Sequence, residues 1–69
     1  NEFQKAFGQR LTQAREAKGL SISELAKLSG VSKSVISTAE RGQNNVCLDT
    51  IRKLADACEV EAAFFFLKD

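Results

Sequence analysis

A short cluster of polar side chains is the part of this chain best suited to chemistry. It consists of Lys33, Ser34, Ser37 and Thr38. On a helix that turns by about 100° per residue, these side chains project away from an apolar side that contains Val35 and Ile36. An ammonium group and short hydroxyl groups on an exposed helix can hydrogen-bond to base edges, because an α-helix fits the major groove of DNA. The cluster is therefore suited to recognising base pairs.

The chain lacks the residue types that catalysis and metal binding most often use. The chain has no His, Tyr or Trp, so the commonest general acid–base residue and the commonest metal ligand are missing. The two cysteines, Cys47 and Cys58, cannot complete a structural zinc site. No nucleophile elbow and no phosphate-binding loop is present. We therefore expect no enzymatic activity, no metal site and no cofactor.

Capping residues and a glycine divide the chain around the polar cluster into two helices. Ser21 and Glu24 have the spacing of a capping box and predict a helix that runs up to Gly30. Ser32 predicts the N-cap of a second helix, over residues 33–41, which contains the polar cluster. Two helices joined by such a short turn can cross steeply, because glycine tolerates the positive φ that the turn needs.

Apolar periodicity predicts one helix before this pair and two helices after it. A first stripe predicts a helix that ends at Lys18, and it consists of Phe3, Phe7, Leu11 and Ala14. Gly8 lies inside that helix, where it would let another backbone approach closely. A second stripe predicts a helix from Leu48 or Asp49 to about Glu59, and it consists of Ile51, Leu54, Ala55 and Cys58. A short fifth helix is predicted over Glu61–Leu67.

Length and charge agree with one small all-α domain over residues 1–69. Residues 1–41 hold seven basic and four acidic side chains, a balance of +3, whereas residues 42–69 hold three and five, a balance of −2. This polarity suits a polyanion on one face, although ordinary solvated charge explains it almost as well. The longest apolar run has six residues, 62–67, too short for the roughly 20 that a membrane span needs. We expect a cytoplasmic protein without a membrane partner.

An ordered set of residues resembles the lambda-repressor/Cro-type (XRE) helix-turn-helix family. The set consists of Arg15, Gly19-Leu20-Ser21, Glu24-Leu25-Ala26, Gly30-Val31-Ser32, Ile36-Ser37, Glu40-Arg41-Gly42 and Leu48-Asp49-Thr50-Ile51. The resemblance covers residues 7–66. It implies a five-helix DNA-binding domain whose second and third helices form the helix-turn-helix. It also implies a sequence-specific transcription regulator, a repressor, that binds double-stranded DNA as a dimer at a roughly palindromic operator.

The resemblance assigns roles to particular side chains. Residues 33–41 become the recognition helix, whose base-contacting residues are Lys33, Ser34, Ser37 and Thr38. The implied phosphate contacts are Ser21, Ser23, Arg41, Gln43 and Asn44, with the residues from Ser21 to Ser23 acting through backbone amides and the helix dipole. Arg15 and Glu40 become a partly buried structural ion pair. Relatives usually carry Gln at the position of Ile22 and Pro-Ser at Val46-Cys47, so one phosphate contact is missing and the cap of the following helix is weaker.

Three consecutive phenylalanines near the end of the chain suggest a second interface. Residues 64–66 cannot all face one core on a helix, because successive side chains turn by about 100°. The pattern predicts Ala62, Phe65 and Phe66 facing the domain and leaves Phe64 and Leu67 on the opposite side. An exposed apolar pair on a small domain calls for a cover, and we expect a second copy of the chain, which makes a homodimer.

The two cysteines lie too far apart on one predicted helix to form a disulfide. Cys58 continues a core stripe and Cys47 lies near the start of the same helix, about 16 Å away at 1.5 Å per residue, so no disulfide is expected between them.

The alternative function is a protein-interaction module, or an antitoxin-like partner of a toxin, with weak or no DNA binding of its own. The net charge of only +1 and the presence of Ile22 favour this alternative slightly.

Overall fold

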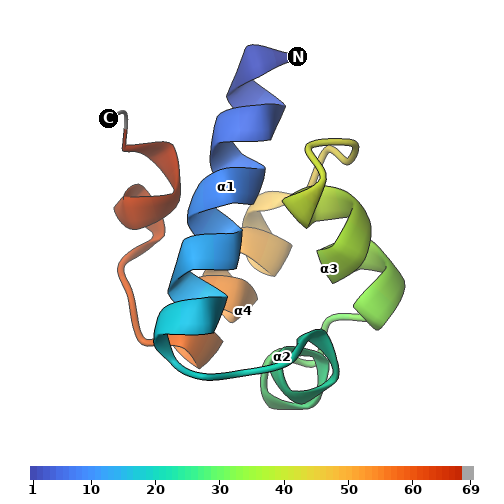
Figure 1. The fold of residues 1–69 in the computed structure, drawn as a ribbon, viewed down its shortest axis with the longest axis vertical. Helices are drawn as coiled ribbons and strands as arrows, with labels where there is room; N and C mark the ends of the chain where they lie inside the picture. The colour runs from blue at the N-terminus through green and yellow to red at the C-terminus, as the bar shows by residue number, and fades with distance from the viewer. Residues whose placement is uncertain (68–69) are drawn as a thin grey trace.

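Four α-helices and one short 3₁₀ helix make up the computed structural model, which describes residues 1–67 (Figure 1). The α-helices are α1 (Glu2–Ala17), α2 (Ile22–Ser29), α3 (Lys33–Glu40) and α4 (Leu48–Cys58), and the 3₁₀ helix is η1 (Ala62–Phe66). α1 runs through the middle of the molecule, with α3 on one side of it, η1 on the other and α4 behind (Figure 1). Among the described residues there is no β-strand.

The expected capping residues begin the two central helices. The Ser21 hydroxyl accepts from the Glu24 backbone N–H at 3.0 Å, and the Ser21 N–H donates to the Glu24 carboxylate at 2.8 Å. The Ser32 hydroxyl accepts from the Val35 N–H at 3.2 Å. The capping box and the Ser32 N-cap are therefore confirmed, and they fix where α2 and α3 begin.

The buried side chains come from every element. They are Phe7, Leu11, Ala14, Leu25, Val31, Ile36, Ala39, Ile51, Leu54, Ala55, Cys58 and Phe65. The buried side chains of α1 and α4 belong to the two predicted stripes. Phe3 is the one stripe residue at the surface, with 65% of its area exposed. The core therefore lies between α1 and α4, and it is closed by α2, α3 and η1.

The prediction of a fifth α-helix over Glu61–Leu67 is wrong. The segment is a five-residue 3₁₀ helix whose turns close three residues apart, from the Phe64 N–H to the Glu61 carbonyl at 2.9 Å. A segment this short makes too few α-helical hydrogen bonds to offset the cost of nucleation. Because a 3₁₀ helix has three residues per turn, the faces predicted at α-helical spacing hold only in part. Phe65 is buried and Leu67 is exposed as predicted, whereas Ala62 and Phe66 are exposed and Phe64 is half-buried.

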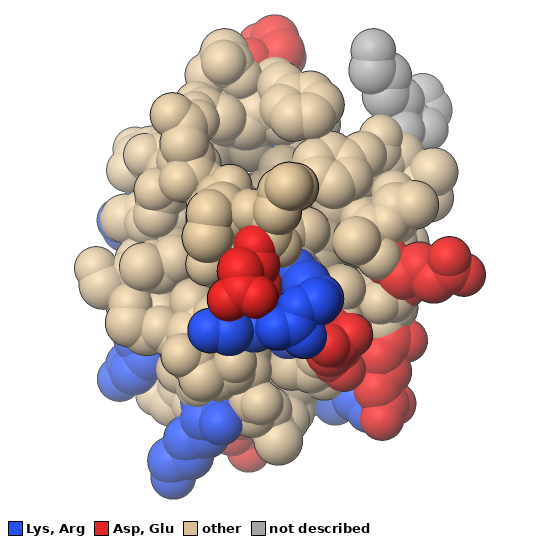
Figure 2. All heavy atoms as spheres, turned by 180° about the vertical axis from the view of Figure 1, so that it is seen from behind, with Lys and Arg blue, Asp and Glu red and all other residues tan. Residues whose placement is uncertain are grey.

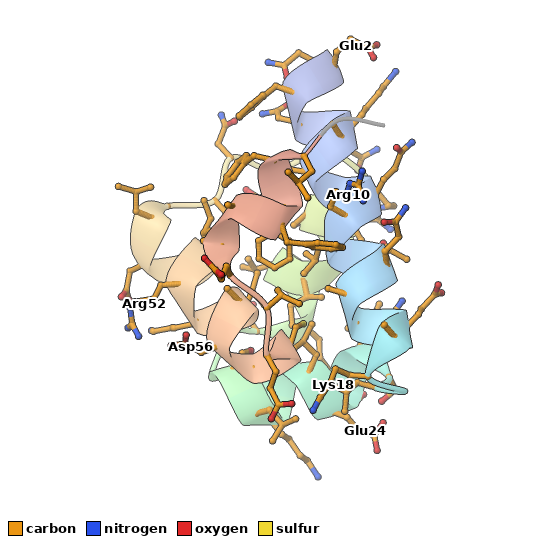
Figure 3. The ribbon with its side chains drawn as sticks, turned by 90° about the vertical axis from the view of Figure 1, so that its left-hand side faces the viewer. Glu2, Arg10, Lys18, Glu24, Arg52 and Asp56 are labelled. Carbon is orange, nitrogen blue, oxygen red and sulfur yellow. The ribbon has the colours of Figure 1, made fainter. Side chains whose placement is uncertain are left out.

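Aromatic contacts and one arginine hold η1 against α1. The fully buried Phe65 ring meets the Phe7 ring edge to face, with centroids 5.2 Å apart. Arg10 donates from Nε to the Leu67 carbonyl at 3.2 Å, and its guanidinium lies 5.3 Å from the centroid of the Phe64 ring. Figure 3 shows Arg10 on α1 beside η1. The fifth element is therefore held by its side chains more than by its own helical bonds.

An ion pair joins α1 to the end of α3. Arg15 donates from Nε to one Glu40 carboxylate oxygen at 2.7 Å and from Nη2 to the other at 3.2 Å. Its Nη1 donates to the Leu20 carbonyl at 2.8 Å, which also ties down the chain before α2. The two side chains are only 14% and 10% exposed. The hydrogen bond to Glu40 raises the pKa of Arg15, so the guanidinium stays charged at any ordinary pH.

A glycine lets the two helix backbones meet next to this ion pair. A Cβ atom at Gly8 would lie 2.5 Å from the Ala39 carbonyl oxygen and 2.6 Å from that of Glu40. Real Cβ atoms do not approach backbone atoms so closely, so any other residue would push α3 away from α1. The close backbone approach expected at Gly8 is therefore present, and it is made by the last turn of α3.

Replacing Gly8 with Ala tests this contact. Alanine favours a helix by about 1 kcal/mol over glycine, yet we expect Gly8→Ala to lower the free energy of unfolding by about 1–3 kcal/mol, because the methyl overpacks the α1–α3 contact. Urea denaturation followed by circular dichroism measures the change. Gln9→Ala, at the exposed neighbouring position, is the matched control and should be neutral. A Gly8→Ala protein as stable as the parent would contradict the contact.

The ion pair is tested by comparing single variants with a double variant. Arg15→Ala or Glu40→Ala should each cost about 3 kcal/mol of unfolding free energy, because each leaves a largely buried charge without its partner. The double variant Arg15→Met/Glu40→Leu should cost less than either, since it leaves no unpaired charge. Denaturation curves at one pH give all three values. If the loss of unfolding free energy in the double variant equals the sum of the losses in the two single variants, the two side chains are not coupled.

Candidate nucleic-acid interface

The turn between α2 and α3 is held by its own hydrogen bonds. Gly30 has a φ of 75°, and its N–H donates to the Ala26 carbonyl at 2.9 Å, ending α2. The Ser29 hydroxyl accepts from the Val31 N–H at 3.1 Å and donates to the Leu25 carbonyl at 2.7 Å. A positive φ is unstrained only for glycine, so Gly30 allows the chain to reverse direction within a few residues. The two helices are thereby held in a fixed relation to each other.

Buried residues on the inner side of α3 leave its other side at the surface. Ile36 is completely buried and Ala39 is 1% exposed. Of the four predicted base-contacting residues, Lys33 and Ser34 are exposed, whereas Ser37 and Thr38 are half-buried. A shallow hollow of about 710 Å³ separates α2 from the start of α3, and its lining includes Ser23, Lys27 and Lys33. The outer face of the helix-turn-helix is therefore polar and accessible.

Acidic partners neutralise most of the basic side chains elsewhere on the domain. Lys18 lies 2.6 Å from Glu59, and Arg52 lies 2.9 Å from Asp49. Arg52 also pairs with Asp56, Lys53 with Asp49 and Lys5 with Glu2. Figure 3 shows Arg52 and Asp56 together on the outer side of α4, and Figure 2 shows basic and acidic side chains in contact near the middle of the rear face.

The pKa values of the paired carboxyl groups follow from these contacts. Hydrogen bonds from Arg52 and then Lys53 lower the pKa of Asp49, and the hydrogen bond to Asp49 raises the pKa of Arg52. The hydrogen bond from Lys18 lowers the pKa of Glu59 in the same way. These carboxylates therefore stay ionised at neutral pH, and they cancel the positive charge next to them.

No acidic partner within residues 1–67 lies beside Lys27, Lys33 or Arg41. Each of them is exposed. Lys27 is in the last turn of α2, Lys33 is the first residue of α3, and Arg41 is its C-cap. These three cations therefore lie on the helix-turn-helix, and sequence reasoning did not single out Lys27 as one of them.

The predicted phosphate-contacting residues fall into two groups. Ser23, Arg41 and Gln43 are exposed, with no side-chain hydrogen bond within the described part of the chain. Ser21 is also exposed, but its hydroxyl and its N–H are both used in the capping box. Asn44 differs from them all, because it is half-buried and its amide nitrogen donates to the Thr38 hydroxyl at 2.9 Å. Its amide group is therefore directed toward α3.

The loop after α3 is fastened at both ends. The Gln43 N–H donates to the Thr38 carbonyl at 2.9 Å and the Gly42 N–H to that of Ala39 at 3.0 Å, with Gly42 at a φ of 72°. This is the Schellman arrangement that ends many helices at glycine. Farther along, Asn45 accepts a hydrogen bond from the Gln4 side chain of α1. Gln4 was not a predicted site residue, and no motif in the sequence marks it as one.

The positions that depart from the family pattern have structural consequences. Ile22 packs against the core and is half-buried, so its side chain does not replace the polar group found in relatives. Cys47 is the N-cap of α4 but makes no capping bond with its side chain, and its Sγ lies 3.2 Å from the Thr50 hydroxyl. That contact lowers the pKa of the Cys47 thiol, whereas burial raises the pKa of Cys58. The two thiols are free and lie at opposite ends of α4.

Residues 1–67 contain no helix with the length and apolar character that a membrane crossing needs. Nor do they contain a group of three His, Cys, Asp or Glu side chains arranged to hold a metal ion.

Comparison with curated proteins gives regulators of transcription. Over 55 residues the chain is 43% identical to the HTH-type transcriptional regulator SinR of Bacillus subtilis (strain 168), covering 78% of this chain and 50% of that protein. Over 61 residues it is 36% identical to the HTH-type transcriptional regulator PuuR of Escherichia coli (strain K12), covering 88% of this chain and 33% of that protein. The chain therefore spans half or less of the length of these relatives.

Solved structures and a family profile agree with these relatives. The restriction-modification controller protein C.AhdI from Aeromonas hydrophila superposes with a TM-score of 0.91 at 47% identity, covering 96% of this chain and 100% of that one. An HTH_3 family transcriptional regulator from Vibrio cholerae superposes with a TM-score of 0.88 at 32% identity, covering 94% of this chain and 36% of that one. The profile of the helix-turn-helix domain family matches residues 6–63. The chain therefore belongs to the Cro/C1-type (XRE) helix-turn-helix family of transcription regulators.

Proposed function

We propose that this domain binds double-stranded DNA with α3 in the major groove and thereby regulates transcription, as a repressor. The observation that carries the proposal is the position of Lys27, Lys33 and Arg41, which are exposed and have no acidic partner within residues 1–67. Unpaired cations on one face bind a polyanion by releasing its counterions. The same observation argues against the alternative of an interaction module that has lost DNA binding.

The side chains divide into two roles. Lys33, Ser34, Ser37 and Thr38 face base edges and set sequence preference, because side chains on a helix in the major groove reach the donor and acceptor pattern of the bases. Arg41 and Gln43 lie at the end of α3, where they contact phosphates. Ser23 contacts a phosphate at the start of α2 through its backbone amide. Ser21 is a weaker candidate, since its N–H and its hydroxyl are both used in the capping box. Asn44 is a weaker candidate for a phosphate contact, since its amide nitrogen is engaged with Thr38.

We also propose that two copies of the chain join through η1 and the adjacent part of α1. Phe64 and Leu67 line a surface hollow of about 400 Å³, and Phe3 and Phe66 line a second hollow of about 280 Å³. The Phe3 and Phe66 rings stack with centroids 5.5 Å apart and yet remain 65% and 40% exposed. The upper part of the rear face is largely uncharged (Figure 2). An apolar area of this kind on a small domain is typical of a protein interface.

A dimer would explain how so short a recognition helix selects a site. One helix reads only a few base pairs, whereas two helices about 34 Å apart meet successive major grooves on one side of the duplex. The identity of 47% with C.AhdI supports a finer proposal, that the chain controls a restriction–modification system. Action on DNA in this role places the protein in the cytoplasm.

The DNA interface is tested by removing a cation from it. We expect Arg41→Ala to weaken binding to all sequences alike and to reduce the slope of log K against log salt concentration by about one unit, because one phosphate contact is lost. Lys33→Ala should instead cost about 1–3 kcal/mol of binding free energy on the sequence that the parent prefers, and it should relax the sequence requirement. Fluorescence anisotropy on short duplexes at several salt concentrations gives both quantities.

Arg52→Ala is the matched control for the DNA test. Arg52 is exposed, like Arg41, but it lies on α4, where it pairs with Asp49 and Asp56. Its removal should leave the affinity and the salt slope unchanged. If Arg41→Ala and Lys33→Ala both bind like the parent, or if Arg52→Ala weakens binding as much as they do, α3 is not the DNA interface.

The dimer is tested with two exposed leucines. Leu67, beside η1, is 52% exposed and Leu28, at the end of α2, is 62% exposed. Leu67→Glu should give a folded monomer that binds its operator much more weakly, because the two half-sites are no longer linked. Leu28→Glu should remain dimeric. Sedimentation velocity measures the mass of each variant, and a parent that is monomeric at high micromolar concentration would disprove the dimer.

A further inference from the structure

The hydroxyl group of Thr38 is enclosed in a small hydrogen-bond network. Its oxygen lies 2.9 Å from the Ser34 carbonyl oxygen and 3.1 Å from that of Val35, one turn earlier in α3. The amide nitrogen of Asn44 lies 2.9 Å from the same hydroxyl oxygen. Thr38 is half-buried, so part of this side chain still reaches the surface of α3.

The bonding capacity of these groups fixes the direction of the hydroxyl proton. Carbonyl oxygens only accept hydrogen bonds, so the Thr38 O–H must donate toward the backbone of its own helix. The Asn44 amide nitrogen only donates, so it occupies one of the two lone pairs of the hydroxyl oxygen. The side chain can therefore offer an outside partner one lone pair and its γ-methyl group, but no hydrogen-bond donor.

This limits which base features Thr38 can read in the major groove. The guanine edge presents two acceptors, N7 and O6, and both would need a donor from the protein. Thymine presents a C5 methyl group, which makes favourable apolar contact with a threonine methyl. Lys33, with three donors and no partner among the described residues, is suited to the acceptors that Thr38 cannot serve.

We propose that Thr38 reads the C5 methyl group of a thymine through its γ-methyl, and that Asn44 is a positioning residue that keeps the hydroxyl turned inward. This inference rests on the proposed function, since it assigns a base preference within the DNA interface. It also gives Asn44 a different role from the phosphate contact that the family resemblance implies. The loop after α3 contributes to specificity through Thr38 and without touching a base.

The experiment removes single methyl groups from the DNA. A site is first selected from random duplexes with the parent protein, and each of its thymines is then replaced in turn by deoxyuridine, which lacks only the C5 methyl. At one position in each half-site the parent should bind the uracil duplex about fourfold more weakly, the effect of one buried methyl or methylene group.

Two variants separate the methyl group from the hydroxyl. Thr38→Ser keeps the hydroxyl and loses the γ-methyl, so it should bind the thymine and uracil duplexes equally. Thr38→Val keeps a methyl and loses the hydroxyl, so it should retain the preference for thymine. Asn44→Ala removes the donor that holds the Thr38 hydroxyl, so it should reduce the preference for thymine and leave the salt slope unchanged, whereas the loss of a phosphate contact would lower the slope instead. Circular dichroism and thermal unfolding show whether the variants are folded. Anisotropy gives the ratio of the affinities for the thymine and uracil duplexes, and a variant that binds both duplexes equally more weakly leaves this ratio unchanged.

The outcomes distinguish this inference from the proposal on which it rests. A parent that binds no DNA at low salt overturns both. A parent that selects a site but tolerates every uracil, or a Thr38→Ser variant that keeps the preference for thymine, overturns the methyl contact alone. If replacing a guanine by 7-deazaguanine weakens binding by the parent but not by Thr38→Val, the Thr38 hydroxyl donates to guanine N7, and the inward direction of its proton is wrong.

Discussion

The close contact between α1 and the last turn of α3 is the constraint on which the rest of the domain depends. Gly8 lets the carbonyl groups of Ala39 and Glu40 approach the α1 backbone, and Arg15 then binds the Glu40 carboxylate with two hydrogen bonds. A glycine alone would leave α3 free to slide, and an ion pair alone would tolerate several distances. Together they fix both the separation and the register of the two helices, and hence the angle at which α3 presents its outer side.

The loop after α3 extends this constraint to the proposed DNA-binding surface. The Schellman bonds to Thr38 and Ala39 begin the loop, and the Gln4 side chain holds Asn45 near the start of α1. The loop is therefore bound to both helices that the α1–α3 contact joins. A loop held in this way keeps the Asn44 amide in place to donate to the Thr38 hydroxyl of α3.

Sequence reasoning predicts the elements that depend on local signals and fails where distant segments decide. The Ser21–Glu24 capping box, the Ser32 N-cap, the glycine stops and the four α-helices follow from spacing, and so does the tight approach at Gly8. After α4, periodicity predicts the inward side of Phe65 correctly but the helix type wrongly, because it cannot reveal the contacts with Phe7 and Arg10 of α1 that hold this segment. The inward direction of the Asn44 amide is invisible for the same reason.

The pattern of ion pairs also shows why net charge is a poor guide to this interface. A balance of +1 gives little reason to expect a polyanion. The structure separates the charges by their partners: Lys18, Arg52 and Lys53 face carboxylates a few ångströms away, whereas the helix-turn-helix keeps its cations unpaired within the described residues. Exposed ion pairs contribute little to stability, about 0–1 kcal/mol each. Their larger effect here is to cancel the positive potential on α4, so that an approaching phosphate backbone is attracted mainly to α2 and α3.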